Sequence, residues 1–479
     1  MQLAIKLSAF VSLIALPGLA LAAPTVSFCA DAQKALLARP AAPIAFLSDS
    51  DSAYAYLEAR QELAFEDNPS VRRWTGNAED EAAIREVITA LDQRVGSEAG
   101  GYAAIYGHIL AQLQQAMPTR FEDPRSIYIL CSVGLAVHAE IAREIPGFVM
   151  PYLGTLPSGT LNARALSVPG SPAELVTVNF SLFTFVHELG KIGLGTIRIE
   201  EKGDQVVIDL SDSYFDAIRS DPEFLVRFSK ALEDFANQRL IRGHAPPRAL
   251  DDPLLQVMNA ALEEFVIAHE FAHLVLGHTR RDLGPAGDFG ETQPLSDAVL
   301  RQRWGEEVVA DLYAAALVQR ISMARNRAAP TDSLESELGE FVRYAPVLFF
   351  QLNQIAEEAR YVHDQTKAPP EFTGDDRAAV LGFLGEAAEA QGSSLGGEPI
   401  ASVTALPVPA IVRQFGDHPP SWARRALVAA YWRSQTPKPK SDTEIALGMV
   451  AITMGNNLEQ MWSDMAPIWV RIAQQERGQ

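Results

Sequence analysis

Residues 262–277 read LEEFVIAHEFAHLVLG, an apolar run that carries two histidines and a glutamate in its centre. Apolar residues recur here at helical spacing, so the run predicts a buried helix. His269 and His273 are four residues apart, which on a helix places them about 40° apart on one face, with Cβ atoms roughly 5–6 Å from each other. Two imidazoles at that spacing can reach one metal ion, whereas burying them without partners would be costly. We therefore expect a metal site on a core helix.

The pattern His269-Glu270-x-x-His273 is HExxH, the zinc-site signature of metallopeptidases. The two histidines are the expected zinc ligands, and Glu270 is the expected general base. An accidental HExxH would usually fall on a helix surface or in a loop, and this one lies inside an apolar helix. A metzincin would need a third histidine at position 279, which is Thr279, so that class is excluded.

The third ligand is expected on a second helix, in the segment 304–317. Glu307 and Asp311 are four residues apart there and share a face with alanines, which would let this helix approach the first one closely. Glu307 is the expected third ligand, and Asp311 can accept the free N–H of a ligand histidine. Glu306 is the alternative ligand. The alternative without a metal is that Glu306 and Glu307 form an ordinary solvated charged face.

Three features together resemble the gluzincin peptidases of the CAAX prenyl protease and HtpX-like family. They are HExxH, His278 five residues after its second histidine, and the sequence E-x-x-A-D at 307–311. The segment HPPSWAR at 418–424 resembles that family's late H-P-x-x-x-x-R segment. The resemblance covers roughly residues 255–430. The chain departs from the family at Arg425, where an aliphatic residue is usual.

The resemblance implies that His418 and Arg424 lie near the active-site cleft and contact the substrate or the transition state. The residue that stabilises the oxyanion is open, with His418, Arg424 and Tyr313 as candidates. His278 has two interpretations. It either supports the zinc ligands from behind or caps the negative end of the helix as a cation.

Composition places further limits on function. The 479 residues carry a net charge of −20, which argues against nucleic acid and anionic membrane surfaces as partners. Residues 1–22 predict a cleaved signal peptide, because Lys6 precedes an apolar run that ends at an A-x-A site. We expect a periplasmic or secreted protein, without stable membrane insertion once the signal is removed.

The two cysteines, Cys29 and Cys131, either pair or stay as buried thiols.

The overall pattern predicts a mainly α (α+β) fold, in which a helical zincin-type core carries a small antiparallel sheet. The clearest strand region is 175–185, and the stretches 195–200 and 205–210 alternate with period two and predict a hairpin. The run His187-Glu188 followed by Lys191 begins like HExxH, but a protonated lysine cannot ligate, so we expect a structural role. The expected segments are a helical N-terminal region 23–150, a linker (151–172) and hairpin region 151–219, a zinc-binding core 220–365 and a helical C-terminal region 366–479 with the HPP segment.

These observations predict a Zn²⁺-dependent metalloendopeptidase of the bacterial envelope that hydrolyses a polypeptide substrate. The alternative is a non-catalytic or latent metal-binding envelope protein that acts as a chaperone-like or partner-binding module. In the latent case, the loop 279–294 or the C-terminal helix would cover the cleft.

Overall fold

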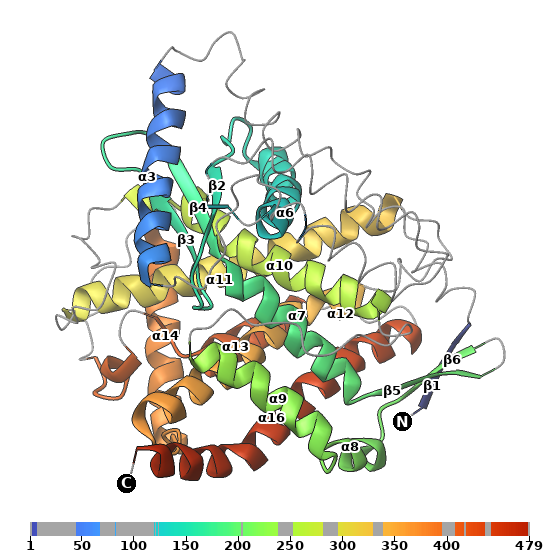
Figure 1. Ribbon diagram of the computed structural model, residues 1–479. Coiled ribbons are helices and arrows are strands. Elements are labelled where there is room, and N and C mark those ends of the chain that lie inside the picture. Colours follow the sequence, from blue (N-terminus) through green and yellow to red (C-terminus); the bar gives the residue numbers. More distant parts are fainter. Residues whose placement is uncertain are drawn as a thin grey trace. The chain divides into compact units, whose positions relative to one another are not determined.

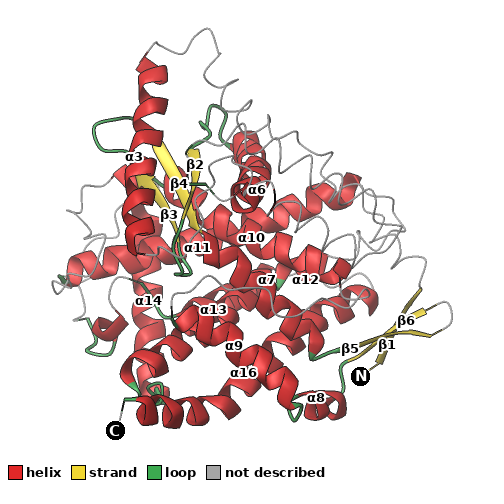
Figure 2. Ribbon diagram, in the orientation of Figure 1, coloured by secondary structure: helices red, strands yellow, loops and turns green. Residues whose placement is uncertain are grey.

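The computed structural model is mainly helical with two small sheets, which confirms the predicted fold class (Figures 1 and 2). It describes residues 2–6, 45–67, 82, 119, 121–122, 124–202, 205–237, 252–280, 296–328, 339–394, 408–415, 418–435 and 442–477. The chain divides into two compact units. The larger unit holds residues 1–14, 185–237 and 242–479, and the smaller unit holds residues 15–184 and 238–241.

The smaller unit contains one three-stranded sheet in the order β2-β4-β3. β2 pairs parallel to β4, and β3 pairs antiparallel to β4. Helix α3 packs on β2 at Gly154, where a Cβ atom would come within 2.2 Å of the Leu57 side chain. The elements are α3 (Ala45–Asp67), α6 (Pro124–Glu144), β2 (Tyr152–Leu156), β3 (Ala163–Ser167) and β4 (Glu174–Asn179).

Two sequence expectations in this region were wrong. The predicted linker at 151–172 contains the strands β2 and β3. The strand predicted for 175–185 ends at Asn179, and helix α7 (Phe180–Gly195) begins at the next residue. A short run that is apolar throughout fits a buried strand and a buried helix equally well, so its periodicity could not distinguish them.

Cys131 lies on α6 and is disulfide-bonded. The only other cysteine of the chain is Cys29, which lies outside the described residues. The disulfide at Cys131 favours the paired alternative that the sequence left open, and pairing with Cys29 stays a prediction.

The larger unit contains an antiparallel sheet in the order β1-β6-β5. Its hairpin consists of β5 (Arg198–Lys202) and β6 (Gln205–Asp209), as the alternating pattern predicted. Strand β1 (Gln2–Lys6) pairs with the other edge of β6. This strand falls within the segment that the sequence predicts to be a signal peptide, and signal cleavage stays a prediction.

Helices build the rest of the larger unit. α10 packs against α11, α11 against α14, and α13 against both α15 and α16. The expected segments 220–365 and 366–479 therefore belong to one compact unit. The helices are α8 (Asp212–Ile218), α9 (Pro222–Ala236), α10 (Asp252–Val275), η2 (His278–Arg280), α11 (Asp297–Ala328), α12 (Gly339–Arg343), α13 (Ala345–Gln365), α14 (Gly374–Ser394), η4 (Val412–Phe415), α15 (Ser421–Gln435) and α16 (Asp442–Glu476).

Aromatic side chains form much of the core around α10 and α11. Phe265 of α10 meets Phe349 and Phe350 of α13 edge to face, with ring centroids 5.6 and 5.5 Å away. Trp304 of α11 is fully buried and meets Phe383 of α14 in the same way. These contacts position the two helices that carry the metal-site motif residues described below.

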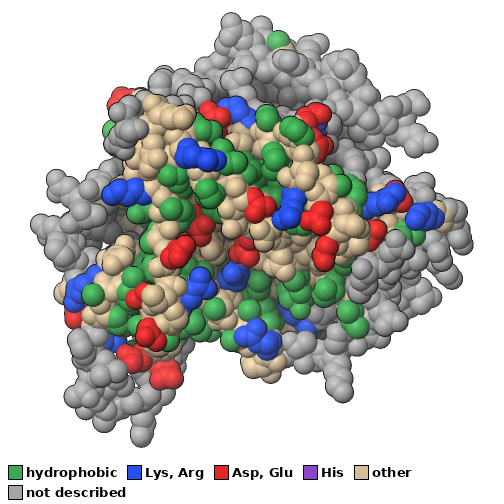
Figure 3. Space-filling view, turned by 90° about the horizontal axis from the view of Figure 1, so that it is seen from below, with side chains coloured by type: hydrophobic (Ala, Val, Ile, Leu, Met, Phe, Trp, Pro, Cys, Tyr) green, Lys and Arg blue, Asp and Glu red, His purple; other side chains and the backbone are tan. Residues whose placement is uncertain are grey.

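Two predicted parts of the chain lie largely outside the described residues, namely residues 83–118 of the helical N-terminal region 23–150 and residues 281–294 of the loop 279–294. Within the described ranges, no helix is both long and apolar enough to span a bilayer. On the face drawn in Figure 3, acidic and basic side chains lie interspersed among hydrophobic ones.

Candidate metal centre

Helix α10 presents both histidines of the HExxH motif on one face. Its first residue is Asp252, which precedes Pro253. Most of its residues between Leu254 and Leu274 are buried. His269 is 9% exposed, so the motif lies in the core rather than on the surface. The helix ends at Val275, and Gly277 follows with a left-handed φ of 71°.

Glu307 of α11 completes a cluster of three donor groups with His269 and His273. The two Nε2 atoms lie 3.1 Å apart. Glu307 oxygens lie 3.4 Å from His269 Nε2 and 3.5 Å from His273 Nε2. A tetrahedral zinc ion with bonds of about 2.0–2.1 Å requires donor atoms roughly 3.3–3.4 Å apart. The donor set and its spacing therefore fit zinc.

Close packing of α10 and α11 produces this spacing. Ala310 and Ala314 of α11 are fully buried, which removes side-chain bulk from the face that carries Glu307. Farther along, Arg325 of α11 forms an ion pair with the buried Glu264 of α10. The expected small-residue face is thus present, and Glu307 rather than Glu306 reaches the histidines.

The other ring nitrogen of each histidine also has a partner. His269 Nδ1 lies 2.9 Å from an oxygen of Asp311, and His273 Nδ1 lies 2.8 Å from Nδ1 of His278. The left-handed turn at Gly277 lets the chain reverse so that His278 faces His273. Such contacts fix the tautomer of a ligand histidine and leave its Nε2 free for a metal. This geometry favours the supporting interpretation of His278.

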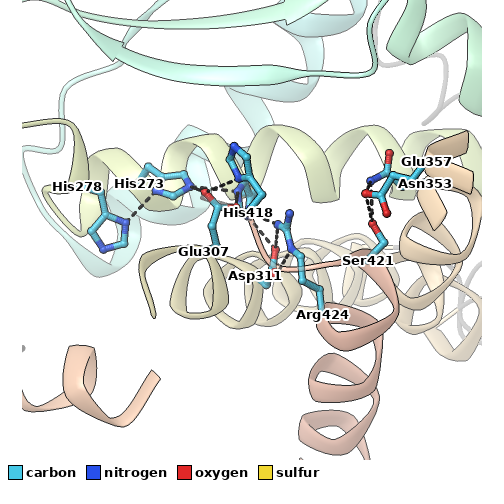
Figure 4. Close-up of polar contacts among 10 residues, drawn as sticks. His273, His278, Glu307, Asp311, Asn353, Glu357, His418, Ser421 and Arg424 are labelled. Atoms are coloured by element: carbon cyan, nitrogen blue, oxygen red, sulfur yellow. Dashed lines mark hydrogen bonds and ion pairs between the residues drawn. The ribbon is translucent and has the colours of Figure 1, made fainter. Parts of the chain in front are cut away.

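The largely buried side chain of Arg424, on α15, points at the carboxylates of α11 (Figure 4). Its Nε and Nη2 donate to Asp311 at 2.7 and 2.6 Å, a two-pronged contact. Nη2 also lies 3.3 Å from Glu307, and the guanidinium carbon lies 4.8 Å from the ring centre of Phe350. Arg424 therefore holds Asp311 in place from behind while Asp311 contacts His269.

His418 lies on the open side of the cluster. Its Nδ1 is 3.5 Å from Glu307, yet 57% of its side chain is exposed. It is therefore the member of the group that a ligand in solution can reach. The segment that resembles the H-P-x-x-x-x-R pattern thus places both its histidine and its arginine at the candidate centre.

A polar trio beside Arg424 was missed by sequence reasoning (Figure 4). Ser421 donates to Glu357 at 2.8 Å, and Asn353 donates to both Ser421 and Glu357, at 2.8 and 2.9 Å. Ser421 is the first residue of α15, so the trio fixes the start of that helix against α13. Pro419-Pro420-Ser421 does predict a helix start, but nothing in the sequence pairs it with α13.

Charges in the cluster shift its protonation. Burial disfavours a charged His269, but the nearby Asp311 and Glu307 carboxylates outweigh burial and raise the His269 pKa to about 10. Burial, together with repulsion from His269, lowers the pKa of His273 well below its usual value. Burial alone would raise the pKa of Glu307, yet His418, His269 and Arg424 hold it well below the usual range. Without metal, the cluster therefore holds one protonated ligand histidine beside an ionised glutamate.

The other motif residues lie as follows. Glu270 is buried on α10, 6% exposed, immediately after the first ligand. Glu306 accepts a hydrogen bond from Gln302 at 2.9 Å and is not part of the three-donor group. The ring of Tyr313 lies under the guanidinium of Arg320 at 5.8 Å.

The run that begins like HExxH, His187-Glu188 followed by Lys191, lies on α7. Lys191 forms a buried ion pair with Glu188 at 2.7 Å, and His187 contacts Asn259 of α10. These contacts fit the structural role that we expected, because both charged groups of the run satisfy each other.

Comparison of the chain with family models, curated proteins and solved structures found no match in any of the three. The resemblance to the gluzincin peptidases therefore rests on the motif residues named above.

Proposed function

We propose that this protein is a zinc-dependent metallopeptidase of the bacterial envelope that cleaves a polypeptide substrate. One observation carries the proposal. Nε2 of His269, Nε2 of His273 and the Glu307 carboxylate lie 3.1–3.5 Å apart, the spacing of donors around tetrahedral zinc. Three protein ligands with a fourth position left open are typical of catalytic rather than structural zinc sites.

Each residue of the site has a separate role. His269, His273 and Glu307 would hold zinc, which supplies the Lewis-acid chemistry that acidifies water and polarises a scissile carbonyl. Glu270 accepts a proton from the attacking water and delivers it to the leaving amine. His418 is half exposed beside Glu307, so it is the best-placed residue to touch the substrate.

Arg424 has a positioning role in this proposal. The family resemblance implies instead that it contacts the substrate. Its side chain is only 13% exposed, and its donors are directed at Asp311 and Glu307. It neutralises the two buried carboxylates and fixes their orientation. Asp311 and His278 in turn hold the ligand histidines in the tautomer that leaves Nε2 free.

Zinc content tests the ligand set. Metal analysis of the purified protein should give one zinc per chain, and Glu307→Ala should lose most of it. Glu306→Ala is the matched control, because it removes the adjacent buried carboxylate outside the donor group. Equal zinc in the two variants would contradict the assignment of Glu307.

Glu270→Gln tests catalysis separately from metal binding. We expect it to keep zinc and to cleave an unfolded protein substrate at least about 100-fold more slowly, the usual contribution of a general base. Undiminished cleavage in this variant would remove Glu270 from the mechanism. A zinc-loaded wild type that cleaves no unfolded chain would favour the non-catalytic or latent alternative.

A further inference from the structure

A cavity of about 450 Å³ lies between α12, α13, α15 and α16 of the larger unit. Its volume falls within the roughly 300–1,000 Å³ of pockets that hold small organic ligands. None of the metal-centre residues lines it. The neighbours Arg424 and Arg425 leave α15 in different directions, since Arg424 contacts Asp311 of α11 and Arg425 contacts Glu459 of α16.

The charged groups that line the cavity are mainly cationic, although the chain as a whole carries a net charge of −20. Among the described residues that line the cavity, three are arginines, Arg343, Arg425 and Arg433, and one is an acid, Glu459. Arg343 is 7% exposed, and a guanidinium cannot lose its charge. Arg433 has no acidic side chain within ion-pairing distance among the described residues. The cavity therefore favours an anion.

Amide groups add hydrogen-bonding capacity to the same wall. Gln351 of α13 donates to Asn456 and Glu459 of α16, at 3.4 and 3.3 Å. Gly455 lets the two helices come this close, because a Cβ atom there would lie 2.0 Å from the Gln351 oxygen. The polar lining is thus held in place before any ligand binds.

The remaining lining is apolar or aromatic and includes Val347, Ala429, Ile452 and Trp432. The guanidinium carbon of Arg343 lies 5.8 Å from the ring centre of Trp432, so cationic and aromatic surfaces adjoin. A bare inorganic ion would leave these surfaces facing water. An organic anion would cover them while its charged group meets the arginines.

We propose that this cavity binds a small organic carboxylate, whose anionic group contacts Arg425 and Arg433 and whose apolar body lies against Trp432 and Ile452. A carboxylate matches the planar fork of an arginine with two parallel hydrogen bonds. The proposal gives a role to Arg425, the position at which the chain departs from the family that it resembles. It does not depend on the proposed peptidase activity.

Benzoate is the probe, titrated into the full chain by calorimetry at low ionic strength. Arg425→Gln should weaken benzoate binding by about tenfold, the usual effect of losing a hydrogen-bonded charge. Glu459→Gln should strengthen it severalfold, because Glu459 is the carboxylate that competes for Arg425. Arg413→Gln should change nothing. Like Arg425, Arg413 is paired with an acidic residue, Asp297, but it lies on η4, outside the cavity.

Benzamide and inorganic phosphate separate the two parts of the proposal. Both should bind at least tenfold more weakly than benzoate, because one lacks the charge and the other lacks the apolar body. If Arg425→Gln does not fold, Arg433→Gln and Glu459→Gln carry the same test, since both positions are partly exposed. No benzoate binding by the wild type would overturn the proposal. So would binding that Arg425→Gln, Arg433→Gln and Glu459→Gln leave unchanged.

Discussion

At the scale of single residues, the charged groups of the candidate metal centre balance one another. His269 lies between Glu307 and Asp311, and Arg424 touches both of these carboxylates. Without metal, a proton on His269 balances part of this negative charge, which is why the pKa of His269 rises to about 10. Zinc and that proton compete for the same nitrogen, because a metal ligand must be deprotonated.

Zinc binding should therefore release close to one proton per ion from the imidazoles at pH 6. His269 is protonated at that pH and must lose its proton, whereas the lowered pKa of His273 leaves that residue already neutral. Water on zinc, with a pKa of about 7, stays mostly intact there. Calorimetric titration in two buffers of different ionisation enthalpy measures the number of protons released per zinc ion bound. Asp311→Asn should reduce it, and a wild-type value near zero would contradict the charge arrangement.

The same shift predicts how the stability of the metal-free protein depends on pH. The pKa of His269 is higher in the folded chain than its ordinary value of 6.5, so its protonation stabilises the fold. This contribution is fully present below about pH 6.5. It is lost as the pH rises towards 10. Urea unfolding of the metal-free protein should show this loss, and zinc-loaded protein should not show it. A flat profile in both forms would argue against the raised pKa.

At the scale of elements, α11 is the helix on which the site depends most. One of its faces brings Glu307 and Asp311 to α10, and it also packs against α14. Gly305 lies at the second contact, where an added Cβ atom would come within 2.4 Å of the Ala387 carbonyl oxygen. A backbone atom cannot move aside as a side chain can, so this glycine sets the distance between the two helices.

Gly305→Ala should destabilise the metal-free protein by about 1–3 kcal/mol, the usual result of overfilling a packed contact. It should also weaken zinc binding, since Glu307 lies two residues away on the same helix. Gly382→Ala in α14 is the matched control, because a Cβ atom there meets nothing within 4 Å. Alanine favours helix over glycine by up to about 1 kcal/mol, so this variant should be neutral or more stable. Urea unfolding measures the free energy of unfolding of both variants. Equal changes in the two would refute the close approach at Gly305.

At the scale of the whole molecule, the chain forms two compact units, and the candidate metal centre lies entirely within the larger one. The smaller unit contains the disulfide-bonded Cys131. Disulfides generally persist in an oxidising compartment, and the export of this chain stays a prediction.

Reduction should destabilise the smaller unit selectively. The chain-entropy model gives about 4–5 kcal/mol for a crosslink between two residues some 100 positions apart, such as Cys29 and Cys131. Protein made in an oxidising compartment should show no reactive thiol when unfolded without reductant, and two after reduction. Cys131→Ser should reproduce the loss of stability while zinc content stays the same. Two reactive thiols before reduction would contradict the crosslink.

The sequence by itself determined the local features of this protein. Helical periodicity predicted α10, and the four-residue spacing predicted that His269 and His273 would share a face. Alternation with period two predicted the β5–β6 hairpin. These features depend on residues close together in the chain, so the sequence pattern contains them.

Only the tertiary structure decided which distant groups meet. It brought Glu307 rather than Glu306 to the histidines, turned Arg424 inward onto Asp311, and set Ser421 against Asn353 and Glu357. It also placed a helix where the apolar run 180–185 suggested a strand. The physical reason is the same in each case, because these outcomes depend on packing between elements far apart in sequence, which no local pattern encodes.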